Sequence, residues 1–536
     1  MAEYSNGSYI YRGAVEQSFL NEALSAFRQY RADKETVAAR IRDDDKFYRD
    51  SCGRYYDRLN SVMTCDTPFI FAAIENSRAD AIDNYPTVNI LERAPEGTKA
   101  AEVLTKVVPA QLEISEFKTA YKDNMRRKLK YGTAVYGVFY NDVTGDIDIK
   151  GIDLLDIYVD MHVSDVQESA FLFIAAAVEN SSLKEWYPNF APLFEGDAEI
   201  DSINGSYRLR DRSSVLDCYY KKPDGTVHMM KLCKDVIIAA TEDLEGYERG
   251  IYEHGLYPVV FDVLYPAENC PFGYGMIDVG KSTQVEINKL DEAITENIMC
   301  SARPRYLSKR SGGINESEFR DVSKNIVHYE GDPDALKPID TVPLSESYIS
   351  HRDRKKEELK EVLANRDFQQ GSTTGGVTAA SAIETLQQAG EKRSRALIND
   401  TYDSYRKIVY MMIELMRQFF AERRVYRVGD ERGEEARFAE FDSSMLYAPP
   451  EKVGDGLKKL VFDIDVVPQR ESPYSRETVN NTILTFWQNG LFKPEERDAA
   501  AIALRAMSFD GKERLISELM RLGTGAVTDN GKGDTK

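Results

Sequence analysis

Basic residues are in deficit in this sequence. Its 536 residues include 89 Asp and Glu against 69 Lys and Arg, which gives a formal net charge of −20. Proteins that grip duplex DNA are usually basic, because neutralised phosphates supply most of their non-specific affinity. A chain this acidic would not hold DNA in that way. The charge alone favours simple solubility, and the alternative is a surface that repels DNA.

Long apolar runs are also lacking. The longest, AFLFIAAAV at residues 170–178, is about half of the ~20 residues that a membrane-spanning helix needs. The first residues, MAEYSNGSYIY, lack the charged start and apolar core of a signal peptide. We therefore expect a soluble protein that is made in a cytoplasm.

Motifs of metal sites and of nucleophilic catalysis are missing as well. The six cysteines are scattered without a C-x-x-C pair, which argues for free thiols in a reducing compartment. The five histidines never sit at ligand spacing, and neither H-E-x-x-H nor G-x-S-x-G occurs. The sequence therefore predicts no metal, no cofactor and no catalytic site.

One motif argues the other way. Residues Gly275–Ser282 read GMIDVGKS and match the phosphate-loop pattern G-x-x-x-x-G-K-[ST]. A phosphate loop needs a strand running directly into its first glycine, whereas here the strand VVFDVLY ends about nine residues too early. Its four variable residues also look like the first turn of an amphipathic helix. A chance match is favoured, and a P-loop ATPase stays as an alternative.

Hydrophobic periodicity predicts a mixed α+β chain. Helices are expected at 12–58, 66–83, 98–131, 478–490 and 511–522, and a disordered tail at 523–536. Strands are expected as hairpins at 134–152 and 215–232 and as single strands at 256–266 and 457–468. The segment 425–445 reads as charged and irregular.

The most informative stretch runs from residue 273 to 424. An amphipathic helix at 276–299 is followed by a break at 302–343, a charged helix at 346–365 and a polar, glycine-rich loop at 368–376. Thr378 then caps a helix without proline to about Arg424, which is about 60–70 Å long. Ordinary helices have about 11–12 residues. This helix must span something large or pack against copies of itself.

This order of elements resembles that of phage portal proteins, in which two stem helices flank a clip and a tunnel loop leads into a long wing helix. Tyr274-Gly275 opens a helix that carries Gln284 and Asn288, similar to the family's Gly…Gln-x-x-x-Asn stem signature. Residues 151–160, GIDLLDIYVD, resemble a strand-turn segment of the portal wing. The resemblance covers about residues 60–500.

The resemblance implies a portal fold with an α/β wing, a two-helix stem, a small α/β clip, one very long wing helix and a helical crown. Its expected segments are a wing at 1–272, stem helices at 273–301 and 344–367, a clip at 302–343, a tunnel loop at 368–377, a long wing helix at 378–423, a wing return strand at 424–472, crown helices at 473–522 and a tail at 523–536.

The resemblance also implies a function. It implies a non-enzymatic ring of twelve copies at one capsid vertex, assembled in the bacterial host cytoplasm, through which double-stranded DNA passes during packaging, retention and ejection. The implied partners are the terminase large subunit, a head–tail adaptor, and the major capsid and scaffold proteins. A minor head or tail protein without a channel remains the structural alternative.

Three groups of residues are candidate sites. The tunnel loop offers hydrogen bonds to phosphate without fixed charge, from Gln369, Gln370, Ser372, Thr373 and Thr374. The clip begins with a basic group, Arg303, Arg305, Lys309 and Arg310. The first stem helix carries an apolar face for packing between copies, at Met276, Val279, Thr283, Ile287, Leu290, Ile294 and Ile298. The alternative interpretations are a simple linker for the loop and a solvated surface for the basic group.

A further basic cluster lies on the predicted helix 98–131. A solvated helix face is the favoured interpretation, over a contact surface for scaffold or capsid subunits. Its residues are Lys118, Lys122, Arg126, Arg127, Lys128 and Lys130.

Overall fold

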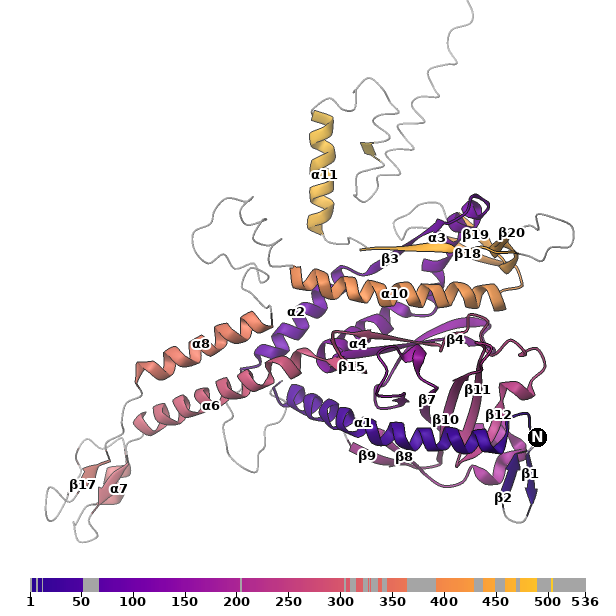
Figure 1. The fold of residues 1–536 in the computed structure, drawn as a ribbon. Helices are drawn as coiled ribbons and strands as arrows, with labels where there is room; N and C mark the ends of the chain where they lie inside the picture. The colour runs from indigo at the N-terminus through magenta and orange to yellow at the C-terminus, as the bar shows by residue number, and fades with distance from the viewer. Residues whose placement is uncertain are drawn as a thin grey trace, which may run out of the picture. The chain divides into compact units, whose positions relative to one another are not determined.

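The computed structural model describes residues 2–5, 8–11, 13–51, 67–202, 205–302, 305–308, 315–321, 326, 328, 336–339, 345–363, 392–428, 437–448, 458–468, 473–488 and 503–504. Two compact units are present. Unit 1 comprises Met1–Asp43, Glu75–Gly275 and Glu391–Lys536, and unit 2 comprises Asp44–Ile74 and Met276–Gly390. The described chain mixes helices and strands, as predicted for an α+β protein (Figure 1).

A five-stranded antiparallel sheet lies in unit 1, in the order β12–β11–β10–β7–β6. Its strands are β6 (Ile157–Tyr158), β7 (Phe171–Glu179), β10 (Arg212–Lys221), β11 (Val227–Cys233) and β12 (Val236–Ala240). The predicted hairpin at 215–232 is confirmed as β10 and β11. Gly225 at its turn has a φ of +85°, which a glycine adopts without strain.

The first part of helix α1 (Gln17–Ser51) packs on this sheet. The Phe19 ring lies 4.8 Å from that of Tyr220 on β10. Lys34 is buried, and its Nζ donates to the carbonyl oxygens of Leu155 and Ile157 at 3.0 and 2.5 Å. The ammonium also lies 4.2 Å from the Tyr158 ring centroid. A buried lysine is therefore satisfied by backbone carbonyls and an aromatic face.

A three-stranded sheet, β13–β4–β5, forms a second layer of unit 1. Its strands are β4 (Thr133–Asn141), β5 (Asp146–Ile152) and β13 (Val259–Val263), so the hairpin predicted at 134–152 is confirmed. Helix α4 (Phe117–Tyr131) precedes β4 and ends at Gly132, whose φ is +84°. A Cβ at Gly132 would lie 2.2 Å from the Tyr274 carbonyl carbon, so only glycine fits.

The basic cluster on α4 is not a solvated face throughout. Lys128 is fully buried, and its Nζ donates to Asp262 Oδ1 on β13 and to Thr401 Oγ1, each at 2.7 Å. Lys130 is buried as well and donates to Tyr131 Oη at 2.8 Å. The predicted solvation was wrong for Lys128 because its partners lie 134 and 273 residues away along the chain.

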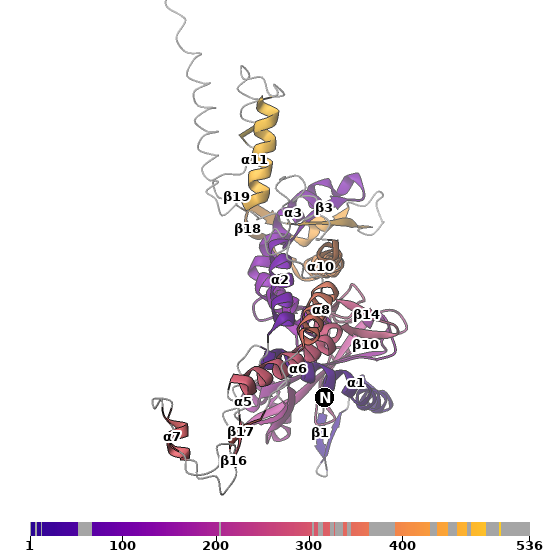
Figure 2. The ribbon, with the colours of Figure 1, turned by 90° about the vertical axis from the view of Figure 1, so that its left-hand side faces the viewer.

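Helix α10 (Lys392–Phe419) crosses unit 1 and contacts strands on two sides. It packs on β13 and β4 of the three-stranded sheet and on β22 (Phe462–Pro468), which pairs with β3 (Pro86–Glu92). Helix α3 (Thr98–Ile114) packs against β3. Figure 2 shows α10 almost along its axis, with β3 and α3 beyond one side of it. The strand predicted at 457–468 is confirmed for Phe462–Pro468, whereas Lys458–Lys459 form a separate strand that pairs with Tyr447–Ala448.

The segment predicted to be irregular, 425–445, has regular structure in its described parts, 425–428 and 437–445. It contains an antiparallel hairpin of β18 (Arg424–Val428) and β19 (Arg437–Phe441), followed by the 3-10 helix η7 (Ser443–Leu446). Tyr426 and Phe441 are buried and anchor the hairpin. The prediction was wrong because arginine and glutamate residues stand among the apolar residues of both strands and obscure the alternating pattern that marks a strand.

The remaining elements are shorter or lie near the ends of the described ranges. They are β1 (Ala2–Ser5), β2 (Ser8–Tyr11), α2 (Phe69–Asp83), η1 (Pro95–Gly97), η2 (Val166–Glu168), α5 (Asn180–Trp186), η3 (Pro188–Leu193), β8 (Ala198–Ser202), β9 (Gly205–Leu209), η4 (Thr241–Asp243), β14 (Tyr265–Ala267), β15 (Cys270–Tyr274), β20 (Tyr447–Ala448), β21 (Lys458–Lys459) and α11 (Pro473–Gln488). The helix predicted at 511–522 and the tail at 523–536 lie outside the described residues.

Candidate functional site

Unit 2 contains two long helices, α6 (Met276–Ala302) and α8 (Glu346–Val362). They run antiparallel to each other (Figure 1). They pack against each other. The face of α6 that is buried in the chain repeats at 3/4 spacing: Ile277, Gly280, Gln284, Ile287 and Asp291. At Gly280 a Cβ would lie 3.2–3.3 Å from Ile70, Leu359 and Leu363, so the glycine permits close packing here.

Charged side chains join the two helices. Arg352 Nε on α8 donates to Asp291 Oδ1 on α6 at 2.6 Å, and the Asp291 side chain is largely buried. Lys355 Nζ lies 3.2 Å from Glu286 Oε2, and His351 Nε2 lies 3.5 Å from Glu286 Oε1. The hydrogen bond from Lys355 lowers the pKa of the Glu286 carboxyl, which keeps it ionised opposite α8.

The two residues of the stem-like signature, Gln284 and Asn288, lie together. Gln284 Nε2 donates to Asn288 Oδ1 at 2.8 Å, and to the Thr67 carbonyl oxygen at 2.9 Å. Gln284 thereby ties α6 to the segment that leads into α2. The signature residues have a structural role within unit 2.

The residues of the phosphate-loop pattern form a helix. Helix α6 begins at Met276, so the residues from there to Ser282 have no loop in which to wrap a phosphate. Lys281 Nζ lies 3.3 Å from Asp44 Oδ1 and 5.3 Å from the Phe47 ring centroid. The lysine serves an ion pair and a cation–π contact within unit 2. The nucleotide-site interpretation therefore loses its structural basis.

The predicted stem face is divided between buried and exposed positions. Met276 and Ile287 are buried in the single chain and are not available to a second copy. Val279 and Ile298 are 43% and 57% exposed. Thr283, Leu290 and Ile294 are half-buried. Burial within the chain removes Met276 and Ile287 from the predicted contact face, and the other five positions stay a prediction.

The predicted clip is described in part. Strands β16 (Tyr306–Ser308) and β17 (Leu336–Pro338) pair, and the short helix α7 (Glu316–Arg320) places Phe319 edge-on to Tyr306 at 4.9 Å. Arg305 is exposed beside β16. The other three basic residues, Arg303, Lys309 and Arg310, lie outside the described residues.

The predicted tunnel loop lies outside the described residues, together with its candidate DNA contacts Gln369, Gln370, Ser372, Thr373 and Thr374. The long helix predicted at 378–423 is described from Lys392. It ends at Phe419, a few residues earlier than predicted, and β18 begins at Arg424.

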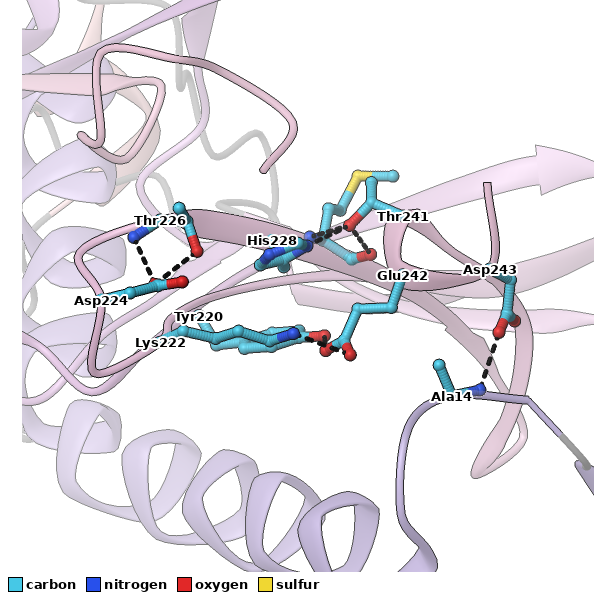
Figure 3. Close-up of polar contacts among 10 residues, drawn as sticks. Ala14, Tyr220, Lys222, Asp224, Thr226, His228, Thr241, Glu242 and Asp243 are labelled. Carbon is cyan, nitrogen blue, oxygen red and sulfur yellow. Dashed lines mark hydrogen bonds and ion pairs between the residues drawn. The ribbon is translucent and has the colours of Figure 1, made fainter. Parts of the chain in front are cut away.

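A polar cluster that the sequence did not suggest lies at one end of β10, β11 and η4 (Figure 3). Tyr220 Oη donates to Glu242 Oε1 at 2.6 Å, and Lys222 Nζ lies 2.9 Å from Glu242 Oε2. Burial raises the pKa of Glu242, but the bonds from Lys222 and Tyr220 outweigh it and leave the pKa below its usual range.

The same cluster fixes two chain connections. Asp224 Oδ1 accepts hydrogen bonds from the Thr226 backbone and hydroxyl groups at 2.9 and 2.6 Å, which closes the β10–β11 turn. Asp243 Oδ1 accepts from the Ala14 amide at 2.8 Å, which holds the chain just before α1 (Figure 3). The cluster is satisfied by its own members, so its role is structural.

No group of three or more His, Cys, Asp or Glu side chains in the described part of the chain is placed to hold a metal ion. Within the same residues, no helix is long and apolar enough to cross a membrane.

The described residues thus form an α+β chain with a unit built on two packed helices. A family model for the phage P22-like portal protein matches residues 70–534. The match covers most of the 536 residues, and the chain belongs to this family of structural virion capsid proteins. A search of curated proteins found no match.

Proposed function

We propose that copies of this chain assemble into a ring around a DNA channel at one capsid vertex, with twelve subunits as in the family it resembles. The ring serves genome packaging, retention and ejection, and it joins head to tail. The observation that carries this proposal is the family match over residues 70–534. The proposed partners are the terminase large subunit, a head–tail adaptor, and the major capsid and scaffold proteins, met in the bacterial host cytoplasm.

The acidic charge supports a conduit. A net charge of −20 per chain repels phosphate, so duplex DNA would pass without adhering to the wall. Such a tube supplies no energy, and the motor that drives DNA is another protein. The polar tunnel loop would make weak, sequence-blind contacts as DNA slides past.

The packed helices α6 and α8 of unit 2 support a ring in which the same helix pair of every copy contacts the next copy. Asp291, Glu286 and their partners on α8 hold the pair together within one chain, so each copy brings a preformed helical unit. The exposed apolar positions Val279 and Ile298 remain for contact with the next copy. A ring needs one head-to-tail interface repeated until it closes.

The segmentation expected from the resemblance is part of the proposal. Helices α6 and α8 would be the stem, the β16–β17 segment the clip, and α10 the long wing helix. The clip arginines and lysines would lie at the channel exit, next to DNA and the adaptor.

Electron microscopy of the purified protein tests the proposal. We expect rings with an axial hole, and a subunit count read from rotationally averaged views. Uniform particles without a hole would contradict the proposal and favour a minor head or tail component. Hydrolysis of ATP by the purified protein that is lost in Lys281→Ala would favour the P-loop alternative.

A further inference from the structure

A groove of about 850 Å³ opens on unit 1 between α10, β13 and β22. Its floor is apolar, because Val259, Val260 and Met411 are buried there. Its rim also presents apolar surface, since Tyr410 on α10 and Val461 beside β22 are 43% and 54% exposed. Pockets of this size and polarity are typical of binding sites.

Some of the charged side chains at the groove are in ion pairs and others are not. Arg93 is paired with Asp463, and Arg406 is paired with Asp403. Asp165, Asp400 and Lys407 are exposed, line the groove, and have no ion pair among the described residues, so the unpaired charges there are two carboxylates and one ammonium. An occupant that brings a cation to this end of α10 would therefore be complementary.

The β18–β19 hairpin of the same unit presents an apolar surface to solvent. Val425 and Phe438 are 61% and 67% exposed, and the strand register places them diagonally on one face. Glu440, opposite Val425 on that face, is paired with Arg423. Arg427 stands directly opposite Phe438 on that face, is exposed, and has no ion pair in the described part of the chain. Figure 1 shows the hairpin near the C-terminal end of α10.

The hairpin is presented rigidly. Its other face is anchored by Tyr426 and Phe441, which are buried, and Arg424 Nη1 lies 2.8 Å from Asp146 Oδ1. An apolar pair on a fixed support loses little conformational entropy on binding.

We infer that Val425 and Phe438 of one copy insert into the α10–β13–β22 groove of the next copy, with Arg427 facing Asp400. The hairpin face and the groove share no residue, so the contact is head-to-tail and can repeat around a ring. The contact removes apolar surface from water and pairs a cation with an anion. The inference rests on the proposed ring and names one surface through which it closes.

Cysteine crosslinking tests the contact directly. The double variant Phe438→Cys/Tyr410→Cys places one thiol on the hairpin and one at the groove rim. Under mild oxidation it should give a ladder of covalent oligomers in a denaturing gel, whereas each single variant and Phe438→Cys/Ile114→Cys should not. Ile114 is 54% exposed and does not line the groove, so it is a matched control. Mixing the two single variants should give a heterodimer and no ladder.

A charge exchange tests the same contact without new cysteines. Arg427→Asp and Asp400→Arg should each lower the association constant for ring assembly by about tenfold, and the double variant should restore it to within about twofold. Circular dichroism would show that each variant is folded.

The outcomes separate the contact from the ring. Wild-type rings together with the ladder and the charge rescue support the inference. Wild-type rings without ladder or rescue overturn it and leave the proposed function standing. Absence of wild-type rings in electron micrographs overturns both.

Discussion

Arg352 on α8 donates from Nε to Asp291 Oδ1 on α6 at 2.6 Å, and Asp291 is 7% exposed. Just over one helical turn before Asp291, the Glu286 carboxylate on α6 lies close to Lys355 and His351 of α8. The two helices therefore hold together through a buried carboxylate that has a cationic partner.

Replacing Arg352 by Ala should loosen this pair. The Asp291 carboxylate would lose its partner in a largely buried place, at a cost of about 2 kcal/mol. Amide hydrogen exchange in residues 346–362 should accelerate by about 30-fold as that segment opens more often. Arg354→Ala is the matched control, since Arg354 is exposed on the same helix. Equal exchange in the two variants would show that the Asp291 bond does not hold α8.

The buried ion pair Lys128–Asp262 predicts a contrast between single and double substitutions. Lys128→Met leaves the Asp262 carboxylate buried without its cation and should destabilise unit 1 by about 3–5 kcal/mol. Lys128→Met/Asp262→Leu removes both charges and should recover most of that loss. Thermal denaturation measures both variants. If the double variant is as unstable as the single variant, the loss of stability comes from losing the ion pair and not from leaving a buried carboxylate without a partner.

His254 predicts a pH dependence of stability. Burial, with a smaller contribution from Lys459, lowers the pKa of His254 to about 4 in the folded chain, against about 6.5 when unfolded. The unfolded state binds the proton first as pH falls, so stability is complete above about pH 6.5 and declines between 6.5 and 4. The total decline is about 3 kcal/mol.

In the wild type, the Leu256 amide donates a hydrogen bond to His254 Nδ1 at 3.0 Å. His254→Asn keeps an acceptor for this amide and removes the titrating imidazole. The melting temperature of the variant should therefore fall less than that of wild type between pH 6.5 and 4.5. His162→Asn, at an exposed position, should leave the wild-type slope unchanged. Parallel slopes for wild type and His254→Asn would contradict the assignment.

Deleting Ser372–Gly375 should spare folding and ring formation but impair DNA retention. The deleted residues are small and polar, so they contribute little to a core. The measurement is DNA content per head after packaging with the mutant ring incorporated. Replacement of the same residues by four alternating Gly and Ser residues is the control for loop length. Heads that keep wild-type DNA content would reduce this segment to a linker.

The sequence predicted elements whose periodicity is local. The hairpins at β4–β5 and β10–β11 and the helix α6 follow from alternating or helical spacing of apolar residues and from turn residues such as Gly225. The pair Gln284 and Asn288 was marked only by its resemblance to the family's stem signature, and the structure joins these two side chains by a hydrogen bond.

Features that depend on distant or polar residues could not be predicted in this way. The face of α6 that is buried within the chain includes Gly280, Gln284 and Asp291, which the spacing of apolar residues does not reveal. Lys128 was taken as solvated because Asp262 is remote in sequence. The β18–β19 hairpin was missed because its exposed face mixes Val425 and Phe438 with charged residues.

The measurement that tests the central claim most directly is the DNA content of heads assembled with and without this protein. The account predicts that heads containing the ring fill with DNA when terminase and ATP are supplied, and that heads assembled without it stay empty. Equal filling of the two preparations would contradict the role of this chain as the DNA conduit.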